Sequence, residues 1–266
     1  MAASLQPQSA SPLVSLRGVG KTFANGLTAL SAFDLDILPC EFISLLGPSG
    51  CGKSTILRLI AGLSEPTSGS LAWSDATPAD HRSEIGYVFQ DPTLMPWASV
   101  ADNVWFPLRL RGVSKREAAS RIDDILSMVG LDGFARAYPR ELSGGMRMRV
   151  SIARALSLRP KLLLMDEPFA ALDEITRFKL NDDLLRLKRE LDCTIVFVTH
   201  SVYESVYLSD RIAVMTPRPG HVAATMTVDA PRERDARFRA SATYAKLCGQ
   251  VSDILARAMI LPGGAS

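Results

Sequence analysis

The sequence lacks three features that would assign its class at once: an excess of one charge, a long apolar run and paired cysteines. Its 266 residues carry 30 Lys and Arg against 28 Asp and Glu, a net charge of +2. A near-neutral chain argues against the basic footprint of a nucleic-acid-binding protein. The apolar runs, such as residues 193–198, have the length of strands rather than the roughly 20 residues that a membrane helix needs. We therefore expect no nucleic-acid partner, and a role at a membrane only through a partner protein.

The cysteines and the N-terminal segment both favour a cytosolic protein. The four cysteines, at positions 40, 51, 193 and 248, show no C-x-x-C spacing. This distribution is typical of free thiols in a reducing compartment, and it favours neither a zinc site nor a disulfide frame. Residues 1–12 are rich in Ala, Ser, Gln and Pro and lack the basic start and apolar stretch of a secretion signal. We expect this segment to be a flexible tail.

Strand-like and helix-like segments alternate along the chain, which predicts an α/β fold with a mainly parallel sheet. Strands are expected across residues 13–46, ending in a buried strand at 42–46, then as hairpin-like strands at 69–73 and 85–89, and finally at 161–165, 194–198 and 222–228. The early strands, interrupted by glycine and proline, predict an N-terminal antiparallel β subdomain. Helices are expected after residue 52 and over residues 173–191.

A helical insertion is predicted at about residues 91–158. Ser114 is a candidate N-cap for a helix that ends at Gly130. Its apolar positions keep 3.6-residue spacing: Ala118, Ile122, Ile125, Leu126 and Val129. We expect one α/β domain over residues 13–220, followed by a strand, a packing helix and a loose tail over residues 221–266.

A glycine-rich loop follows the strand at 42–46. It matches the P-loop pattern G-x-x-x-x-G-K-[ST] with Gly47, Pro48, Ser49, Gly50, Cys51, Gly52, Lys53 and Ser54, and Thr55 comes next. Glycines let successive N–H groups turn inward around phosphates, and a helix N-terminus adds positive charge. Lys53 is placed to reach the outer phosphates, and the Ser54 hydroxyl to bind Mg²⁺. The P-loop alone leaves the class open between kinase, GTPase, motor and transporter.

Two further strand ends carry candidate catalytic groups. The apolar run at 162–165 ends in Asp166 and Glu167. A buried strand that ends in Asp is the usual Mg²⁺ anchor of P-loop enzymes, so we assign Asp166 to the metal. Glu167 is then placed to polarise a water at the γ-phosphate. His200 closes the strand at 194–199, at the functional edge of such a sheet, where it is expected to sense the γ-phosphate.

The run Leu142, Ser143, Gly144, Gly145, Met146 resembles the ABC signature L-S-G-G-Q, and it decides the family. Other landmarks of ABC ATPases stand in the family's order: Phe23 as the adenine platform, Gln90 as the Q-loop residue and Mg²⁺ ligand, Ala171–Leu172–Asp173 as the D-loop and His200 as the switch histidine. The resemblance covers residues 14–219. It implies an ABC ATPase fold whose cofactors are ATP and Mg²⁺.

The resemblance also implies a composite site. In the family's fold the signature segment, with Ser143, Gly144 and Gly145, faces the ATP held by a second copy of the subunit, and Asp173 lies at the same interface. Two ATP molecules are then held in a head-to-tail dimer. The further partners implied are an integral-membrane permease and a periplasmic or lipoprotein solute-binding protein, with the ATPase peripheral on the cytoplasmic side of the inner membrane.

Three departures refine the resemblance. Met146 in place of Gln resembles the variant of importers of the nitrate, sulfonate and taurine type. Met148 stands where that subgroup usually carries Gln, and Phe23 replaces the commoner Tyr. The segment at 91–100 also resembles that group, so Leu94, Met95 and Trp97 are either a permease-docking patch or ordinary packing.

Two alternative functions remain open, and one cysteine is predicted to be reactive. The alternatives are a non-transport ABC ATPase that acts as a scaffold or regulator with soluble partners, and a lone P-loop kinase, which the signature run disfavours. Within the P-loop, Lys53 and a helix N-terminus lie close to Cys51 in sequence, and both favour a reactive thiolate whose alkylation blocks ATP binding. The alternative is that Cys51 is a small residue that simply fits the loop.

Overall fold

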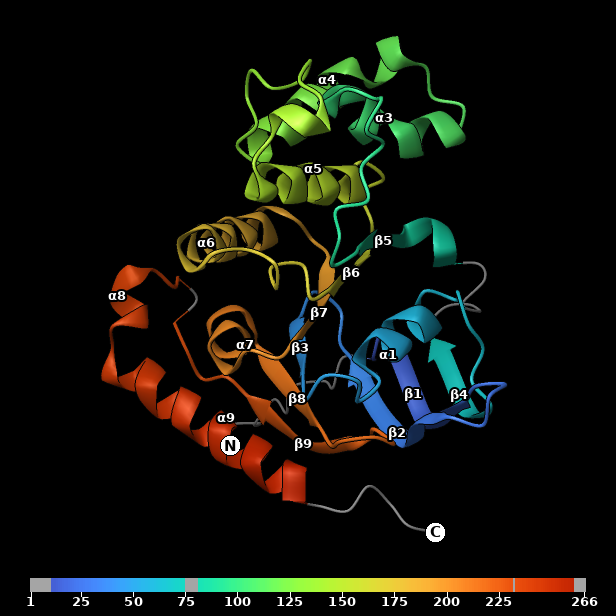
Figure 1. Cartoon of the computed structure of the whole chain (residues 1–266), viewed down its shortest axis with the longest axis vertical. Helices are drawn as coiled ribbons and strands as arrows, with labels where there is room; N and C mark the ends of the chain where they lie inside the picture. Colours follow the sequence, from blue (N-terminus) through green and yellow to red (C-terminus); the bar gives the residue numbers. More distant parts are fainter. Residues whose placement is uncertain (1–10, 75–80, 232, 261–266) are drawn as a thin grey trace, which may run out of the picture.

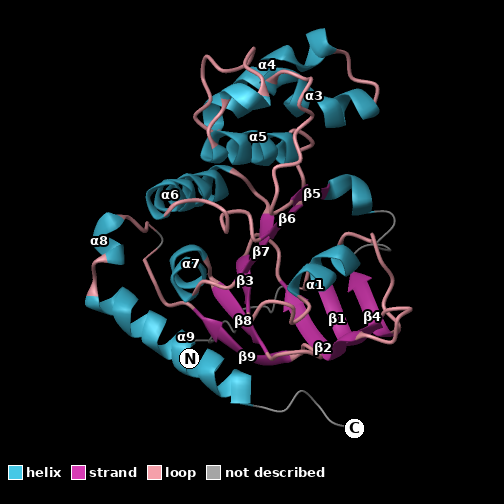
Figure 2. Cartoon of the chain, in the orientation of Figure 1, coloured by secondary structure: helices cyan, strands magenta, loops and turns pink. Residues whose placement is uncertain are grey.

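The computed structural model describes residues 11–74, 81–231 and 233–260 and has three layers (Figure 1). An antiparallel sheet lies on one side of a central, mostly parallel sheet, with a helical layer beyond one edge of the latter. Figure 2 shows helix between the two sheets and further helices on the opposite side of the central sheet. The α/β architecture predicted from the sequence is confirmed, whereas the expected limits of the domains remain predictions.

The antiparallel sheet has the strand order β2-β1-β4. Its strands are β1 (Val14–Thr22), β2 (Thr28–Ile37) and β4 (Ser68–Trp73). The inward residues of this sheet, such as Leu16 and Phe33, pack with α1 (Lys53–Ile60) and one face of the central sheet in a single apolar core. This packing fixes the loop before α1 between two sheets.

The central sheet has the order β5-β6-β7-β3-β8-β9. Its strands are β5 (Ile85–Val88), β6 (Leu162–Asp166), β7 (Thr194–Thr199), β3 (Phe42–Leu46), β8 (Arg211–Met215) and β9 (Val222–Thr227). All neighbours are parallel except β8 and β9. β3, β6 and β7 are buried on both faces, which explains their continuous apolar runs. Their carboxyl ends meet at one edge, where the predicted site residues follow.

One expectation is wrong: the hairpin-like strands at 69–73 and 85–89 belong to different sheets. β4 pairs with β1, and β5 pairs in parallel with β6. The physical reason lies in burial, because β5 buries Gly86 and Val88, whereas β4 exposes most of its length. β5 therefore joins the central sheet and β4 closes the outer one.

The helical layer holds α3 (Val100–Leu110), α4 (Lys115–Met128) and α5 (Gly144–Leu156). Ser114 caps α4 as predicted, with a capping box to Glu117. α6 (Glu174–Glu190) and α7 (Val202–Leu208) lie against the central sheet, and the C-terminal α8 (Ala236–Arg239) and α9 (Ala242–Ile260) run beside α7 and β8. In Figure 1 the helical layer stands at the top, away from α9.

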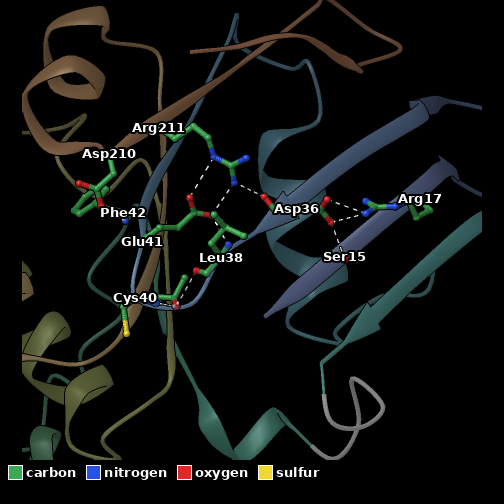
Figure 3. Close-up of polar contacts among 10 residues, drawn as sticks. Ser15, Arg17, Asp36, Leu38, Cys40, Glu41, Phe42, Asp210 and Arg211 are labelled. Atoms are coloured by element: carbon green, nitrogen blue, oxygen red, sulfur yellow. Dashed lines mark hydrogen bonds and ion pairs between the residues drawn. The ribbon is translucent and has the colours of Figure 1, made fainter. Parts of the chain in front are cut away.

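A buried ion pair joins the two sheets (Figure 3). Arg211 on β8 donates from Nη2 to Oε1 of Glu41 at 2.8 Å and also to the backbone carbonyl of Asp36 on β2. The Asp36 carboxylate in turn accepts from Arg17 on β1 at 2.7 Å. Desolvation raises the pKa of Glu41 despite this pairing. Arg211 therefore links β8 of the central sheet to β2 of the outer sheet.

Candidate functional site

The loop between β3 and α1 closes around Lys53. Gly50 and Gly52 adopt positive φ values of 76° and 107°, which a side chain would make costly. Lys53 is only 4% exposed, and its ammonium donates to the carbonyls of Gly47 at 2.8 Å and Pro48 at 2.9 Å. The turn thus folds the lysine back over its own loop, beside the N-terminus of α1.

The end of β6 brings Asp166 to the first turn of α1. Its Oδ1 accepts a 2.8 Å hydrogen bond from the Ser54 hydroxyl. Burial raises the pKa of Asp166, and the bond from Ser54 opposes that rise. A hydroxyl and a carboxylate side by side can bind Mg²⁺, whose other coordination positions are filled by phosphate oxygens and waters. The described residues contain no cluster of three or more His, Cys, Asp or Glu with metal-ligand geometry.

Glu167 lies between two groups that the sequence places far from it. It has a positive φ of 45°, and its N–H donates to the carbonyl of Val198 at 3.1 Å. Its Oε1 lies 3.4 Å from the ammonium of Lys53, and its Oε2 accepts from Nδ1 of His200 at 2.9 Å. A non-glycine residue with this backbone conformation is held there by its surroundings. The carboxylate is therefore fixed at the mouth of the loop.

A hollow of about 250 Å³ lies over the loop. It is lined by Phe23, Leu27, Ala29, Gly50, Gly52, Lys53, Ser54, Thr55, Glu167 and Arg218. Phe23 presents a ring that is 39% exposed, with the Lys21 ammonium 5.8 Å from its centroid. An exposed aromatic beside a phosphate-binding loop has the position that stacking on a base requires.

Arg218 is a site residue that the sequence reasoning missed. Its Nε donates to the carbonyl of Gly50 at 3.0 Å, although 168 residues separate the two. No local motif marks it, because the β8–β9 connection that carries it reaches the loop only in three dimensions. It places a second cation next to Lys53 at the hollow.

The remaining predicted site residues lie outside this hollow. Ser143 caps α5 by accepting from the N–H of Met146 at 3.2 Å, and Asp173 caps α6 by accepting from Thr176 at 2.9 Å. A Cβ on Gly145 would lie 2.6 Å from the side chain of Thr176, so this position has no room for a larger residue. Gln90 is exposed just beyond β5. Within one chain the signature segment therefore belongs to the helical layer, and the loop belongs to the sheet.

The expectation of a reactive Cys51 is wrong. Its side chain is 1% exposed, and desolvation raises the pKa of the thiol more strongly than the nearby Lys53 lowers it. A Cβ on Gly47 would lie 3.0 Å from its sulfur, so the thiol fills space under the loop. Cys51 is a packing residue.

Met148 and the proposed docking residues Leu94, Met95 and Trp97 differ in how far they are exposed. Met148 is 2% exposed within the helical layer, so it packs instead of presenting a polar group. Leu94 and Met95 are half-buried, whereas Trp97 is 77% exposed. The permease-docking patch stays a prediction that rests on Trp97 above all.

Comparison with known proteins agrees with this geometry. The model of the family described as ABC transporter matches residues 30–170. The chain belongs to the ABC transporter family. Within the family it is an ATPase subunit, with ATP as its nucleotide. Within the described ranges, no helix is both long and apolar enough to cross a bilayer.

Relatives of this ABC ATPase carry names for different solutes. An aliphatic sulfonates import ATP-binding protein of Pseudomonas syringae is 46% identical over 85% of this chain and 90% of its own. A spermidine/putrescine import ATP-binding protein of Marinobacter nauticus is 47% identical over 76% of this chain but only 55% of its own. A solved ATP-binding cassette, described as a dimer in a post-hydrolysis state with ADP and Pi, superposes with a TM-score of 0.71 at 35% identity, covering 82% of this chain and all of that one.

Proposed function

We propose that this ABC ATPase powers an importer for a small solute of the nitrate, sulfonate or taurine type. The observation that carries the catalytic part is the Glu167 carboxylate held between Lys53 and His200 at the mouth of the loop. The importer assignment draws support from the sulfonate relative, which the chain matches over nearly its whole length, and from Met146 in the signature segment.

We assign the roles in hydrolysis as follows. Lys53 binds the outer phosphates, the loop N–H groups of residues 47–55 surround them, and Phe23 stacks on adenine. Ser54, Asp166 and Gln90 would hold Mg²⁺, which when bound neutralises phosphate charge. Glu167 accepts a proton from the attacking water, while His200 orients the Glu167 carboxylate and contacts the γ-phosphate.

The active site we propose is completed by a second copy. Ser143, Gly144, Gly145 and Asp173 lie outside the hollow of their own chain, so in this account they contact the ATP of the partner in a head-to-tail dimer. The N-terminus of α5, capped by Ser143, is a suitable donor end for a γ-phosphate. The dimeric cassette similar to this chain supports the arrangement.

The proposed partners are membrane permease subunits, contacted through the patch at Trp97, and a periplasmic or lipoprotein solute-binding protein. The ATPase is then a peripheral subunit on the cytoplasmic face of the inner membrane. The solute is selected by the other subunits, which fits the similarity of this chain to relatives named for an anionic and for a cationic solute.

Capture of a trapped complex tests the transport assignment. Tagged Glu167→Gln protein with ATP and Mg²⁺ is used as bait on detergent-solubilised membranes of the native host. Tagged Lys53→Ala, which is expected to bind ATP poorly, is the matched control. We expect a polytopic permease with the first bait only, and uptake of taurine, nitrate or an alkanesulfonate to fail when the gene is deleted. Capture of soluble partners only, with unchanged uptake, would favour a scaffold or regulator instead.

A further inference from the structure

The hollow over the P-loop carries one cation that no carboxylate offsets. Its lining holds two positive side chains, Lys53 and Arg218, and one acid, Glu167. Glu167 lies 3.4 Å from the Lys53 ammonium, so these two charges largely cancel. Among the described residues no carboxylate pairs with Arg218, whose hydrogen-bond partner is the carbonyl of Gly50 at 3.0 Å. Arg218 therefore supplies the net positive charge of the hollow.

Arg218 is available to a ligand in the hollow. Its side chain is exposed, and its bond to Gly50 uses only the Nε–H. The Nη2 atom packs beside Gly50, where a Cβ would lie 2.9 Å from it. A guanidinium holds its N–H donors in one plane, and this fork matches the oxygens of a phosphate group. The N–H groups of the two Nη atoms thus remain for a ligand at the mouth of the loop.

The connection between β8 and β9, which carries Arg218, is held against both β2 and the P-loop. Gly220 donates from its N–H to the carbonyl of Ala29 at 2.9 Å and accepts from the N–H of Ser31 at 3.2 Å, both on β2. A Cβ on Gly220 would lie 2.0 Å from the carbonyl oxygen of Cys51. Figure 1 shows this connection beside β2. Backbone contacts therefore place Arg218, so its ordering costs little when a ligand binds.

The contact with Gly50 places Arg218 at the part of the hollow that is suited to phosphate. Phe23 and Leu27 come from the turn between β1 and β2, and the ring of Phe23 offers a surface for a base. Gly50 belongs to the loop whose N–H groups surround phosphates in the mechanism proposed above. A phosphate chain is negatively charged, whereas a base is neutral. The charge of Arg218 therefore favours a contact with phosphate.

We propose that Arg218 binds the phosphate chain of ATP as a second cation beside Lys53, an inference that rests on the nucleotide site proposed above. The Nη groups donate to phosphate oxygens while the Nε–H stays on Gly50. In the described part of the chain no hydrogen bond or ion pair joins Arg218 to Glu167 or His200, the groups assigned to the attacking water. Arg218 is therefore expected to bind ground state and transition state alike, which lowers KM and leaves kcat unchanged.

Nucleotide titration of Arg218→Gln tests the proposal, because glutamine keeps a donor for the Gly50 carbonyl but removes the charge. We expect the Kd for ATP and the KM to rise about tenfold, the value of one charge-assisted hydrogen bond. The kcat at saturating ATP should stay within about threefold of the natural chain. GTP should lose as much affinity as ATP, and both losses should shrink as the salt concentration rises. An unchanged Kd, a loss confined to ATP, or a lower kcat at an unchanged KM would overturn the proposal.

Three further variants separate this contact from other causes. Arg218→Lys keeps the charge and should bind ATP more tightly than Arg218→Gln; a lysine variant that binds no better would contradict the proposal. Arg116→Gln makes the same change on exposed α4 and should bind ATP as the natural chain does. Loss of ATP binding in Lys53→Ala with normal binding in Arg218→Gln would overturn this inference alone. Normal binding in both would also count against the P-loop as the nucleotide site.

Discussion

His200 donates from Nδ1 to Oε2 of Glu167 over 2.9 Å, across the neighbouring ends of β7 and β6. The other carboxylate oxygen, Oε1, lies 3.4 Å from the Lys53 ammonium. The histidine is half-exposed, and the carboxylate is largely covered. Both oxygens of Glu167 thus have a partner within the chain, so in the proposed mechanism His200 positions the base as well as contacting the γ-phosphate.

Replacement of His200 by Ala is expected to slow ATP turnover by roughly 10–100-fold, since the base loses its orienting partner. ATP affinity should change far less, because Lys53 and the loop are intact. Steady-state hydrolysis together with equilibrium nucleotide binding checks both expectations. His200→Gln, which keeps a side-chain N–H, should recover part of the turnover; equal turnover in the Ala and Gln variants would count against a positioning hydrogen bond.

Thiol labelling should modify Cys40 well before Cys51. Cys40 is exposed, whereas Cys51 is buried and has a raised pKa. A higher pKa leaves less thiolate at a given pH, so labelling of Cys51 should be at least roughly tenfold slower than that of Cys40 and should speed up as the pH rises. Mass spectrometry after timed alkylation at pH 8 measures this order. Fast, ATP-protected labelling of Cys51 would restore the thiolate hypothesis.

The Glu41–Arg211 pair is expected to be worth far more than the exposed pair beside it. Arg211→Met leaves the buried Glu41 carboxylate with the N–H of Leu38 but without its positive partner, and it should lower the free energy of unfolding by about 3–5 kcal/mol. Arg17→Met removes the exposed partner of Asp36 and should cost about 1 kcal/mol or less. Urea denaturation of the two variants compares them directly.

The same pair has a defined pH dependence. Burial places the pKa of Glu41 above its ordinary value. The buried negative charge therefore lowers the free energy of unfolding as the pH rises above about 4.5. The deficit of Arg211→Met should therefore be largest at neutral pH and shrink as the pH falls and Glu41 takes up a proton. A deficit that stays constant between pH 7 and pH 5 would show that Arg211 stabilises the fold by packing alone.

The sequence predicted what local chemistry determines and missed what depends on tertiary contacts. The β3–loop–α1 unit, the β6 strand ending in Asp166 and the cap at Ser114 follow from short patterns, and the structure has all three. The placement of β4 and β5 in different sheets depends on which faces are buried, so adjacency in sequence was misleading. Arg218 reaches Gly50 from a segment 168 residues away, and no pattern of spacing marks such a contact.

The most direct test of this account is ATP binding and single-turnover hydrolysis by Glu167→Gln. The glutamine keeps the shape of the side chain but cannot accept a proton from water. We expect ATP to bind with near-normal affinity in the presence of Mg²⁺ and hydrolysis to fall by about 10²–10⁴-fold, with the variant accumulating as an ATP-bound dimer. Turnover within a few-fold of the natural chain would contradict the role assigned to Glu167.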